Sequence, residues 1–258
     1  MRNCLFTRTH ASLLAATLGV ASSTALAHNH ITVTTASGSA GDKIMIDAGY
    51  YPTETMFTIE DGRLMMDGSP AIYDVIDTFA SGPFAGWYGG DEILLTADYY
   101  YFTGRLDGGD FRWEIANVTP IAGPNATLVW GMFDESFEFM PMCASNVSNR
   151  FERSFSTPGG DHNHDQAYTF SDAGIYDVTF IAWDSNGKFA DSDPITIRFR
   201  VGPACDADFN ADGFLDFTDF DDFVSAFEAG SSRSDFNADG FLDFTDFDAF
   251  VQAFEAGC

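Results

Sequence analysis

Short runs of alternating hydrophobic and polar residues, many of them rich in aromatics, follow one another from residue 28 to about residue 202. Gly, Pro, Asn and Asp separate these runs, and no run keeps a helical period. Many short strands divided by turn residues are typical of an all-β sandwich or barrel. The predicted strands are residues 31–35, 43–48, 56–60, 71–79, 92–102, 111–118, 127–133, 137–142, 166–170, 175–183 and 195–201.

The last two predicted strands form the clearest hairpin, with turn residues at 184–187. Gly174, Tyr176 and Val178 stand at alternating positions at its start. This G-x-Y-x-V pattern is typical of the tyrosine corner of an immunoglobulin-like sandwich. We therefore predict an all-β, immunoglobulin-like sandwich domain over residues 28–202.

A helical pattern replaces the alternating one near the C-terminus, and it occurs twice. Residues 208–230 recur as residues 235–257, with differences only at positions 222/249 and 225/252. Apolar residues at i, i+3, i+4 and i+7 predict one amphipathic helix in each copy. These residues are Phe220, Phe223, Val224 and Phe227, and then Phe247, Phe250, Val251 and Phe254. Only four residues separate Gly230 from Asp235, so each copy has room for one loop and one helix.

Each copy opens with twelve residues spaced like an EF-hand calcium loop. Oxygen-bearing side chains stand at positions 1, 3, 5, 9 and 12, glycine stands at position 6, and position 7 offers a backbone carbonyl. Ca²⁺ prefers six to eight such hard oxygen ligands. The ligands predicted for the first ion are Asp208, Asn210, Asp212, the carbonyl of Phe214, Asp216 and Asp219. Those for the second ion are Asp235, Asn237, Asp239, the carbonyl of Phe241, Asp243 and Asp246.

Two D-x-[ND]-x-D-G-x5-D loop-helix units in tandem resemble the dockerin module. The flanking Cys205 and the terminal Gly257-Cys258 further resemble the GC-type dockerins of exported bacterial proteins. This resemblance implies a small α-helical module at residues 203–258 that binds two calcium ions and attaches the protein to a cohesin-like scaffold. Loop positions 10 and 11, often Ser-Thr in dockerins, are Phe-Thr here, at residues 217–218 and 244–245. Another surface scaffold protein is therefore the alternative partner.

Two properties of the module predict how it is stabilised. Cys205 and Cys258 stand at its two ends, and a disulfide between them would close about 54 residues. Such a loop stabilises by roughly 4 kcal/mol in the chain-entropy model, and we expect Cys143 to stay free. The module also carries 14 acidic residues and one arginine, a net charge of −13. We expect it to unfold largely without calcium.

The first 27 residues predict a secretory signal peptide. Arg2 and Arg8 precede an apolar stretch at residues 11–20, and residues 25–27 form an A-x-A cleavage site. No later segment reaches the 18 or so consecutive apolar residues of a transmembrane helix. We therefore expect an exported protein, secreted or held at the cell surface. Its formal charge of −27 disfavours a nucleic-acid partner and favours cations.

Two His-Asn-His triplets contain every histidine beyond the signal peptide. On a strand, residues i and i+2 share a face, so His28 and His30 together with His162 and His164 could supply a tetrahedral zinc site. Copper is the alternative, bound by His28 and its free α-amine. Solvated strand ends without metal are the third interpretation. The second triplet, with the later motifs G-x-Y (174–176) and F-x-V-G (199–202), loosely resembles surface-anchored repeat domains of exported bacterial proteins.

Catalytic motifs are weak in this sequence. It contains no G-x-S-x-G, phosphate loop or H-E-x-x-H, and therefore favours a non-catalytic binding protein over an enzyme. The alternative is a carbohydrate-binding or glycoside-hydrolysing component on the same dockerin-like module, using carboxylates such as Asp134, Glu135 and Glu138. The larger aromatics would either stack on a polysaccharide or fill the core. They are Trp87, Tyr88, Tyr99, Tyr100, Tyr101, Trp113, Trp130 and Trp183.

Overall fold

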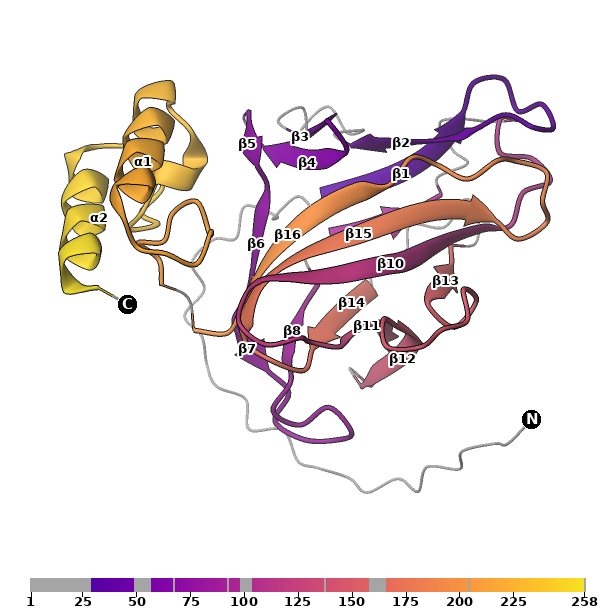
Figure 1. Cartoon of the computed structure of the whole chain (residues 1–258), viewed down its shortest axis with the longest axis horizontal. Coiled ribbons are helices and arrows are strands. Elements are labelled where there is room, and N and C mark those ends of the chain that lie inside the picture. Colours follow the sequence, from indigo (N-terminus) through magenta and orange to yellow (C-terminus); the bar gives the residue numbers. More distant parts are fainter. Residues whose placement is uncertain are drawn as a thin grey trace.

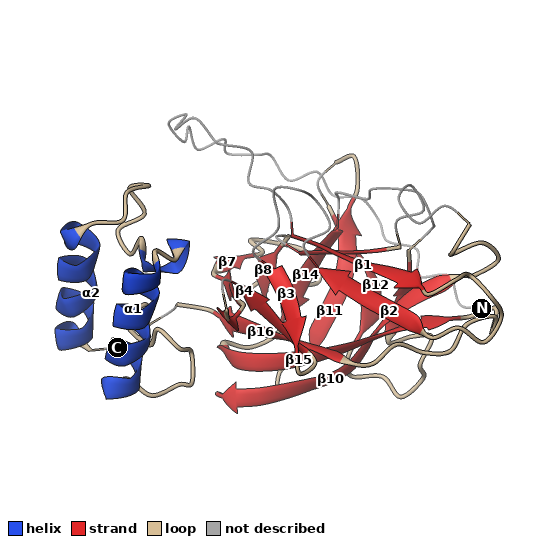
Figure 2. Cartoon of the chain, turned by 90° about the horizontal axis from the view of Figure 1, so that it is seen from above, coloured by secondary structure: helices blue, strands red, loops and turns tan. Residues whose placement is uncertain are grey.

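Strands are the main secondary structure of the chain, and two helices follow them at the C-terminal end (Figure 1). The computed structural model describes residues 29–48, 57–66, 68–91, 93–97, 104–136, 138–157, 166–203 and 205–257. Both helices lie together at one side of the strands (Figure 2). The prediction of a mainly β fold followed by C-terminal helices is confirmed. No helix among the described residues is long and apolar enough to cross a membrane.

The bounds of the longer elements lie close to the predicted runs. The strands are β1 (Asn29–Thr35), β2 (Ile44–Ala48), β3 (Phe57–Glu60), β4 (Arg63–Met66), β5 (Ser69–Pro70), β6 (Ile72–Val75), β7 (Asp77–Thr78), β8 (Tyr88–Gly90), β9 (Ile93–Thr96), β10 (Phe111–Ala122), β11 (Leu128–Phe133), β12 (Phe139–Ala144), β13 (Ser154–Ser156), β14 (Gln166–Phe170), β15 (Gly174–Asp184) and β16 (Ile195–Val201). The helices are α1 (Phe217–Ala229), the short 3₁₀ turn η1 (Ser232–Ser234) and α2 (Phe244–Ala256).

The described strands form three sheets. Their orders are β2-β1-β9, then β13-β10-β15-β16-β4-β3, and β12-β11-β14-β8-β7. In the second sheet β5 also pairs with β4, and β6 pairs with β16. The predicted hairpin is present as the antiparallel pair β15–β16, whereas β16 pairs with β6 in parallel. Strands from distant parts of the sequence therefore meet beside β16.

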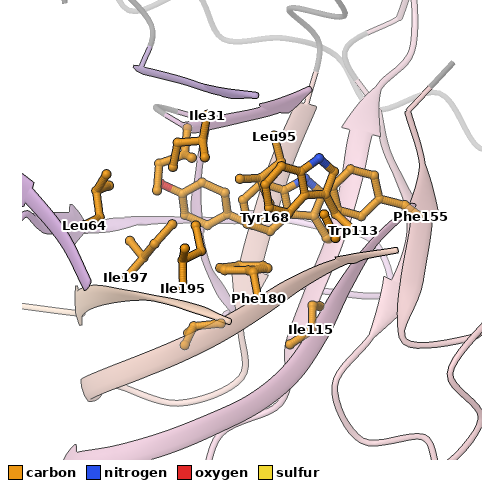
Figure 3. Packing of buried hydrophobic residues seen from close by; sticks show 14 of the residues in the cluster. Ile31, Leu64, Leu95, Trp113, Ile115, Phe155, Tyr168, Phe180, Ile195 and Ile197 are labelled. Atoms are coloured by element: carbon orange, nitrogen blue, oxygen red, sulfur yellow. The ribbon is translucent and has the colours of Figure 1, made fainter. Parts of the chain in front are cut away.

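Aromatic rings from the second and third sheets meet in the main core (Figure 3). The Trp130 ring of β11 stacks on Phe155 at a centroid distance of 5.7 Å and meets Phe180 of β15 edge-on at 5.5 Å. Tyr168 of β14 meets Phe199 of β16 edge-on at 5.2 Å. Edge-to-face and offset-stacked pairs of this kind add to the stabilisation that comes from burying the rings. The two sheets therefore face each other across one shared hydrophobic layer.

Tyr176 forms the corner that the G-x-Y-x-V pattern predicts. Its hydroxyl donates a hydrogen bond to the carbonyl of Asp172 or of Ala173, at 3.2 and 3.1 Å. Burial, and then the charge of Asp172, raises the pKa of this hydroxyl to about 12. A Cβ atom at Gly174 would lie 2.7 Å from the same hydroxyl and 2.5 Å from the carbonyl oxygen of Ala122. Position 174 therefore requires glycine.

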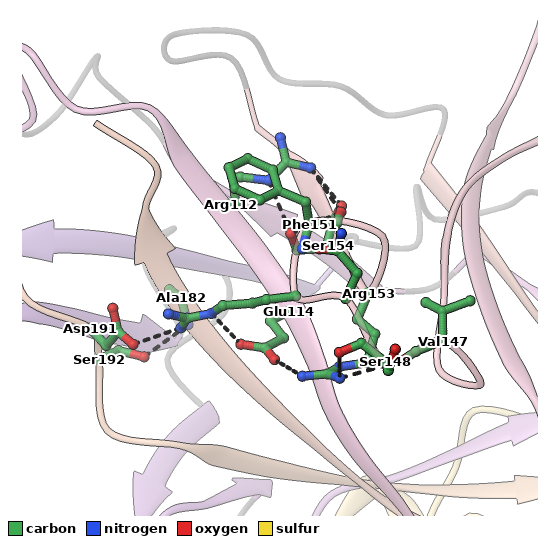
Figure 4. A network of polar contacts seen from close by, with 12 residues as sticks. Arg112, Glu114, Val147, Ser148, Phe151, Arg153, Ser154, Ala182, Asp191 and Ser192 are labelled. Carbon is green, nitrogen blue, oxygen red and sulfur yellow. Dashed lines mark hydrogen bonds and ion pairs between the residues drawn. The ribbon is translucent and has the colours of Figure 1, made fainter. Parts of the chain in front are cut away.

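A buried carboxylate ties the segment after β12 to the second sheet. Glu114 of β10 accepts from Arg150 Nε at 2.7 Å and from Arg153 Nη2 at 2.6 Å (Figure 4). Arg150 also reaches Asp191 at 2.6 Å, and its guanidinium lies 4.4 Å from the centroid of the Trp183 ring. A buried charge needs such partners, because an unpaired carboxylate in the interior is strongly destabilising.

Several short strands fall outside the predicted runs. β4, β5, β8 and β13 carry too few alternating apolar residues for the sequence pattern to mark them, and the predicted strand 71–79 is divided into β6 and β7 at Ile76. β8 contains Gly89 and Gly90, which the pattern places in a turn. A Cβ atom at Gly89 would lie 2.6 Å from the Phe79 ring. Glycine at this position therefore allows the ring to pack directly against the backbone of β8.

An aspartate caps the N-terminus of each C-terminal helix. The Asp216 side chain accepts from the backbone N–H of Thr218, and Asp219 completes a capping box. Asp243 and Asp246 repeat the arrangement before α2. The helices pack through Phe223 and its counterpart Phe250, whose rings stack at 4.0 Å with an angle of 4° between their planes. The two predicted apolar faces therefore meet each other and form a second, smaller core.

Candidate calcium sites

The first loop folds around the carboxylate of its first residue. Asp208 Oδ1 accepts from the backbone N–H of Asp212 at 3.1 Å, and Oδ2 accepts from Gly213 at 3.0 Å. Ala211 and Gly213 have positive φ angles of 52° and 89°, which turn the chain back on itself. Positions 1, 5 and 6 of the predicted calcium loop therefore lie next to one another.

Asp219, at position 12, closes the loop from the first turn of α1. Its Oδ1 accepts from the backbone N–H of Asn210 at 3.2 Å, and its Oδ2 accepts from Asp216 at 2.9 Å. The Asp219 side chain is fully buried. One carboxylate thus links positions 3, 9 and 12, which all belong to the predicted ligand set.

The second loop repeats these hydrogen bonds atom for atom. Asp235 accepts from Asp239 at 3.1 Å and from Gly240 at 3.0 Å. Asp246 accepts from Asn237 at 3.2 Å and from Asp243 at 2.9 Å. The spacing in the sequence therefore produces the same local structure twice.

Crowding of negative charge is visible at Asp208. Burial raises the pKa of this carboxyl, and the charges of Asp219 and Asp212 raise it further. Hydrogen bonds from the backbone N–H groups of Gly213 and Asp212 act in the opposite direction and lower the pKa. At the edge of the loop the hydrogen bonds from Thr218 lower the pKa of Asp216 instead. Carboxylates that repel one another in this way favour a cation, because opposite charge nearby stabilises their ionised form.

The donor set of each loop fits calcium in kind. It offers four carboxylates, one amide oxygen and one backbone carbonyl, all of them hard oxygens. Within the described residues, however, no group of three or more His, Cys, Asp or Glu side chains is close enough to hold a metal ion. Calcium binding therefore stays a prediction that the fold of the loops supports.

Neither a protein-family model nor a curated protein matches this chain. The dockerin-like assignment thus rests on the residues of the repeat and on the geometry of its two loops.

Exposed phenylalanines mark both copies of the module. Phe214 and Phe217 have exposed fractions of 72% and 78%, and their counterparts Phe241 and Phe244 have 72% and 82%. Phe244 also lines a surface hollow of about 460 Å³ together with Thr245, Phe247, Asp248 and Val251. The sequence analysis did not predict that these rings are exposed. The pattern did indicate it, because the rings stand outside the i, i+3, i+4, i+7 set that forms the contact between the helices.

Only one of the four predicted histidine ligands falls within the described residues. His30 lies on β1 with 8% of its surface exposed and is in register with Leu94 of β9. His28, His162 and His164 lie outside the described residues. Gln166, two positions after His164, exchanges hydrogen bonds with the backbone of Leu95, at 3.1 and 3.0 Å. The four-histidine site stays a prediction.

The cysteines differ in their chemical state. Cys143 is buried with a free thiol, and burial raises its pKa to about 12. Cys205 takes part in a disulfide. Its predicted partner, Cys258, lies outside the described residues, so the pairing itself stays a prediction.

The large aromatics of the β-rich domain divide between core and surface. Trp113 and Trp130 are fully buried and Trp183 is nearly so, which makes them packing residues rather than a sugar-stacking face. Trp87 is partly exposed and meets Phe84 edge-on at 5.2 Å. Tyr99, Tyr100 and Tyr101 lie outside the described residues.

Of the acidic residues considered as catalytic carboxylates, Asp134 has a structural role. Asp134 Oδ1 accepts from the backbone N–H groups of Ser136 and Glu138, at 2.8 and 2.9 Å, and so closes the turn between β11 and β12. Glu135 and Glu138 are exposed on that turn.

A second surface hollow, of about 170 Å³, lies by β7 and β8, and no sequence pattern predicted it. It is lined by Asp77, Thr78, Phe79, Gly89, Gly90, Asp91 and Phe133.

Proposed function

We propose that this chain is an exported, non-catalytic protein that a calcium-loaded, dockerin-like module attaches to a cohesin-like or other surface scaffold. The observation that carries this proposal is the exact duplication of the two loops. Both hold the predicted ligand residues in the same turn, with the same carboxylates accepting the same backbone N–H groups. A solvated acidic tail has no reason to repeat such a set.

The β-rich domain is, in this proposal, an immunoglobulin-like sandwich. Its support is the corner at Tyr176, whose hydroxyl bonds back to the backbone three or four residues upstream. The face-to-face packing of aromatic rings from two sheets agrees with the same architecture. Such a domain would be the part of the protein that the module displays.

The exposed rings support a protein partner for the module. Large apolar side chains that stay in water cost free energy, and exposed apolar patches often mark protein interfaces. Phe217 and Phe244 occupy loop position 10 in the two copies, and each is followed by a threonine. A partner that buries one of these rings would recognise a phenylalanine instead of the serine common in dockerins.

Calcium titration of the full chain by calorimetry tests this proposal. We expect two ions per chain, and we expect Asp212→Ala and Asp239→Ala each to remove one of them. Asp221→Ala is the matched control, because Asp221 is exposed and lies two positions beyond the loop that ends at Asp219. Absence of calcium binding by the unmodified chain would contradict the proposal.

A zinc site at the histidine triplets is a further part of the proposal. It is supported by the hydrogen bond between Gln166 and the backbone of Leu95. Leu95 follows Leu94, the residue of β9 that pairs with His30, so Gln166 lies close to the strand that carries His30. Metal analysis of the exported protein tests it, with zinc expected and copper as the alternative. Binding should weaken as the pH falls through about 6.5, where free imidazole becomes protonated.

The second candidate function is carbohydrate binding, with glycoside hydrolysis as its enzymatic form. The hollow by β7 and β8 favours it, since carboxylates and aromatic rings together are the groups that contact sugars in many sites. Retention of the full chain on insoluble cellulose, xylan or chitin tests this candidate. Retention that Asp77→Asn and Phe133→Ala abolish would support it over a purely scaffolding role.

A further inference from the structure

The last strand of the β-rich domain holds the first calcium loop directly. Arg198 of β16 donates from Nη1 to the carbonyl oxygen of Ala211 at 3.1 Å. Its Nε and Nη2 meanwhile hold both carboxylate oxygens of Asp177 on β15, at 2.7 and 3.0 Å. One guanidinium thus bridges the sheet and the loop.

Arg200 makes a second bridge two residues later. Its Nη1 donates to the carbonyl oxygens of Asp208 and Cys205 at 3.2 and 3.4 Å. The other side of its guanidinium pairs with Asp74, which lies on β6, with Nη2 to Oδ2 at 2.8 Å. Because i and i+2 lie on the same face of a strand, β16 presents both arginines to the module together.

The two calcium loops have identical sequences but different surroundings. Residues 208–221 and 235–248 are the same in all fourteen positions. Ala211 is fully buried, whereas its counterpart Ala238 is exposed. A Cβ atom at Gly213 would lie only 2.5 Å from Cβ of Ala122 on β10, and at Gly240 it would meet nothing within 4 Å. The contact with the β-rich domain therefore distinguishes the first loop from the second, together with a hydrogen bond inside the module from Arg233 to the carbonyl of Phe209 at 2.7 Å.

We propose that Arg198 and Arg200 couple calcium binding at the first loop to docking of the module on the β-rich domain, while the second loop binds calcium independently. This inference rests on the proposed calcium binding. The arginines bond the carbonyls of positions 1 and 4, and the predicted calcium ligand from the backbone is the carbonyl of position 7. Calcium and the arginines thus stabilise the same loop conformation without competing for its oxygens.

Charge opposes this coupling only weakly. Each guanidinium is paired with a carboxylate of the β-rich domain, and because Asp177 also pairs with Arg63, the three arginines and two carboxylates together carry a formal charge of +1. Coupling between binding sites is reciprocal, so calcium at the first loop must also strengthen docking. Removal of calcium should release the module from the sheet.

Calcium affinity, measured by calorimetry in single-site chains, tests the inference. The Asp239→Ala chain reports the first loop alone, and the Asp212→Ala chain reports the second loop alone. Into each we would introduce Arg198→Lys together with Arg200→Lys. Lysine keeps the positive charge, which itself affects calcium affinity, but its single ammonium lacks the planar fork that holds a carboxylate and a carbonyl at once.

We expect the lysine pair to weaken calcium binding at the first loop by about fivefold or more, and to change the second loop by less than about twofold. Equal effects on both loops, or none on either, would overturn the coupling while leaving the proposed function intact. If neither loop of the unmodified chain takes up calcium, the proposed function fails and the inference fails with it.

A second comparison does not depend on the lysine variants folding. In chains that keep Arg198 and Arg200, the Asp239→Ala variant, which retains the first loop, should bind calcium about fivefold or more tightly than the Asp212→Ala variant, which retains the second. The two remaining loops are identical in sequence. Equal affinities in these two chains would contradict the inference.

Discussion

Asp177 on β15 binds Arg63 of β4 and Arg198 of β16, and through Arg198 it is linked to the module. Arg63 Nη2 reaches Asp177 Oδ2 at 2.8 Å, and Arg198 holds both oxygens of the same carboxylate. Burial acts to raise the pKa of Asp177, but hydrogen bonds from Arg198 and Arg63 outweigh it, and the pKa is lowered. The folded protein therefore binds this proton less readily than the unfolded chain.

A lowered pKa makes a prediction about stability and pH. The contribution of Asp177 is present above the unfolded-state pKa of about 3.9 and is lost as the pH falls through the lower, folded-state pKa. We expect Asp177→Asn to destabilise the β-rich domain by about 3 kcal/mol near neutral pH. Thermal unfolding followed by near-ultraviolet circular dichroism should show this difference shrinking below about pH 4. A difference that stays constant down to pH 2 would contradict the role given to this carboxylate.

Cys143 supplies a second prediction at the residue scale. Its thiol is buried and its pKa is raised to about 12, so almost no thiolate forms near pH 8. We expect the native protein to react with a thiol-specific disulfide reagent only very slowly at this pH, and the unfolded protein to react at once. Rapid labelling of Cys143 in the native state would show that the thiol is accessible.

At the scale of elements, the two helices depend on one aromatic contact. Phe223 and Phe250 are fully buried and stack on each other, whereas Phe217 at the start of α1 is exposed. Phe223→Ala should lower the free energy of unfolding of the module by about 3–5 kcal/mol. Phe217→Ala, the matched control, should change it by less than about 0.5 kcal/mol. Thermal loss of the helical circular dichroism signal measures both, and similar effects from the two variants would argue against the packing described.

Strands and helices with a clear hydrophobic period could be predicted from the sequence. Strands that form only by pairing with a neighbouring strand could not. β14 and β16 have the bounds that their apolar runs predict. α1 and α2 begin three residues before the first apolar residue of each predicted face, because Asp216 and Asp243 cap the backbone there. β8 and β13 form only because another strand lies beside them. Three-residue strands carry no period of their own.

The same division holds for the candidate sites at the scale of the whole molecule. All the predicted calcium ligands of one loop lie within twelve residues, so spacing alone was enough to predict them. Arg198 and Arg200 gave no such signal, because their importance comes from where β16 places them relative to residues 205–211. The hollow beside β7 unites residues about 50 positions apart, and the sequence could not reveal it.

Calcium-dependent folding of the module is the central claim of this account, and the full chain allows it to be measured directly. We would record amide resonances by two-dimensional ¹H–¹⁵N NMR in calcium and again after adding a chelator. We expect chelation to collapse the resonances of residues 205–257 toward random-coil positions, because their carboxylates then repel one another unopposed, and to leave the core strands β10, β15 and β16 dispersed. Unchanged, dispersed resonances from α1 and α2 after chelation would contradict the claim.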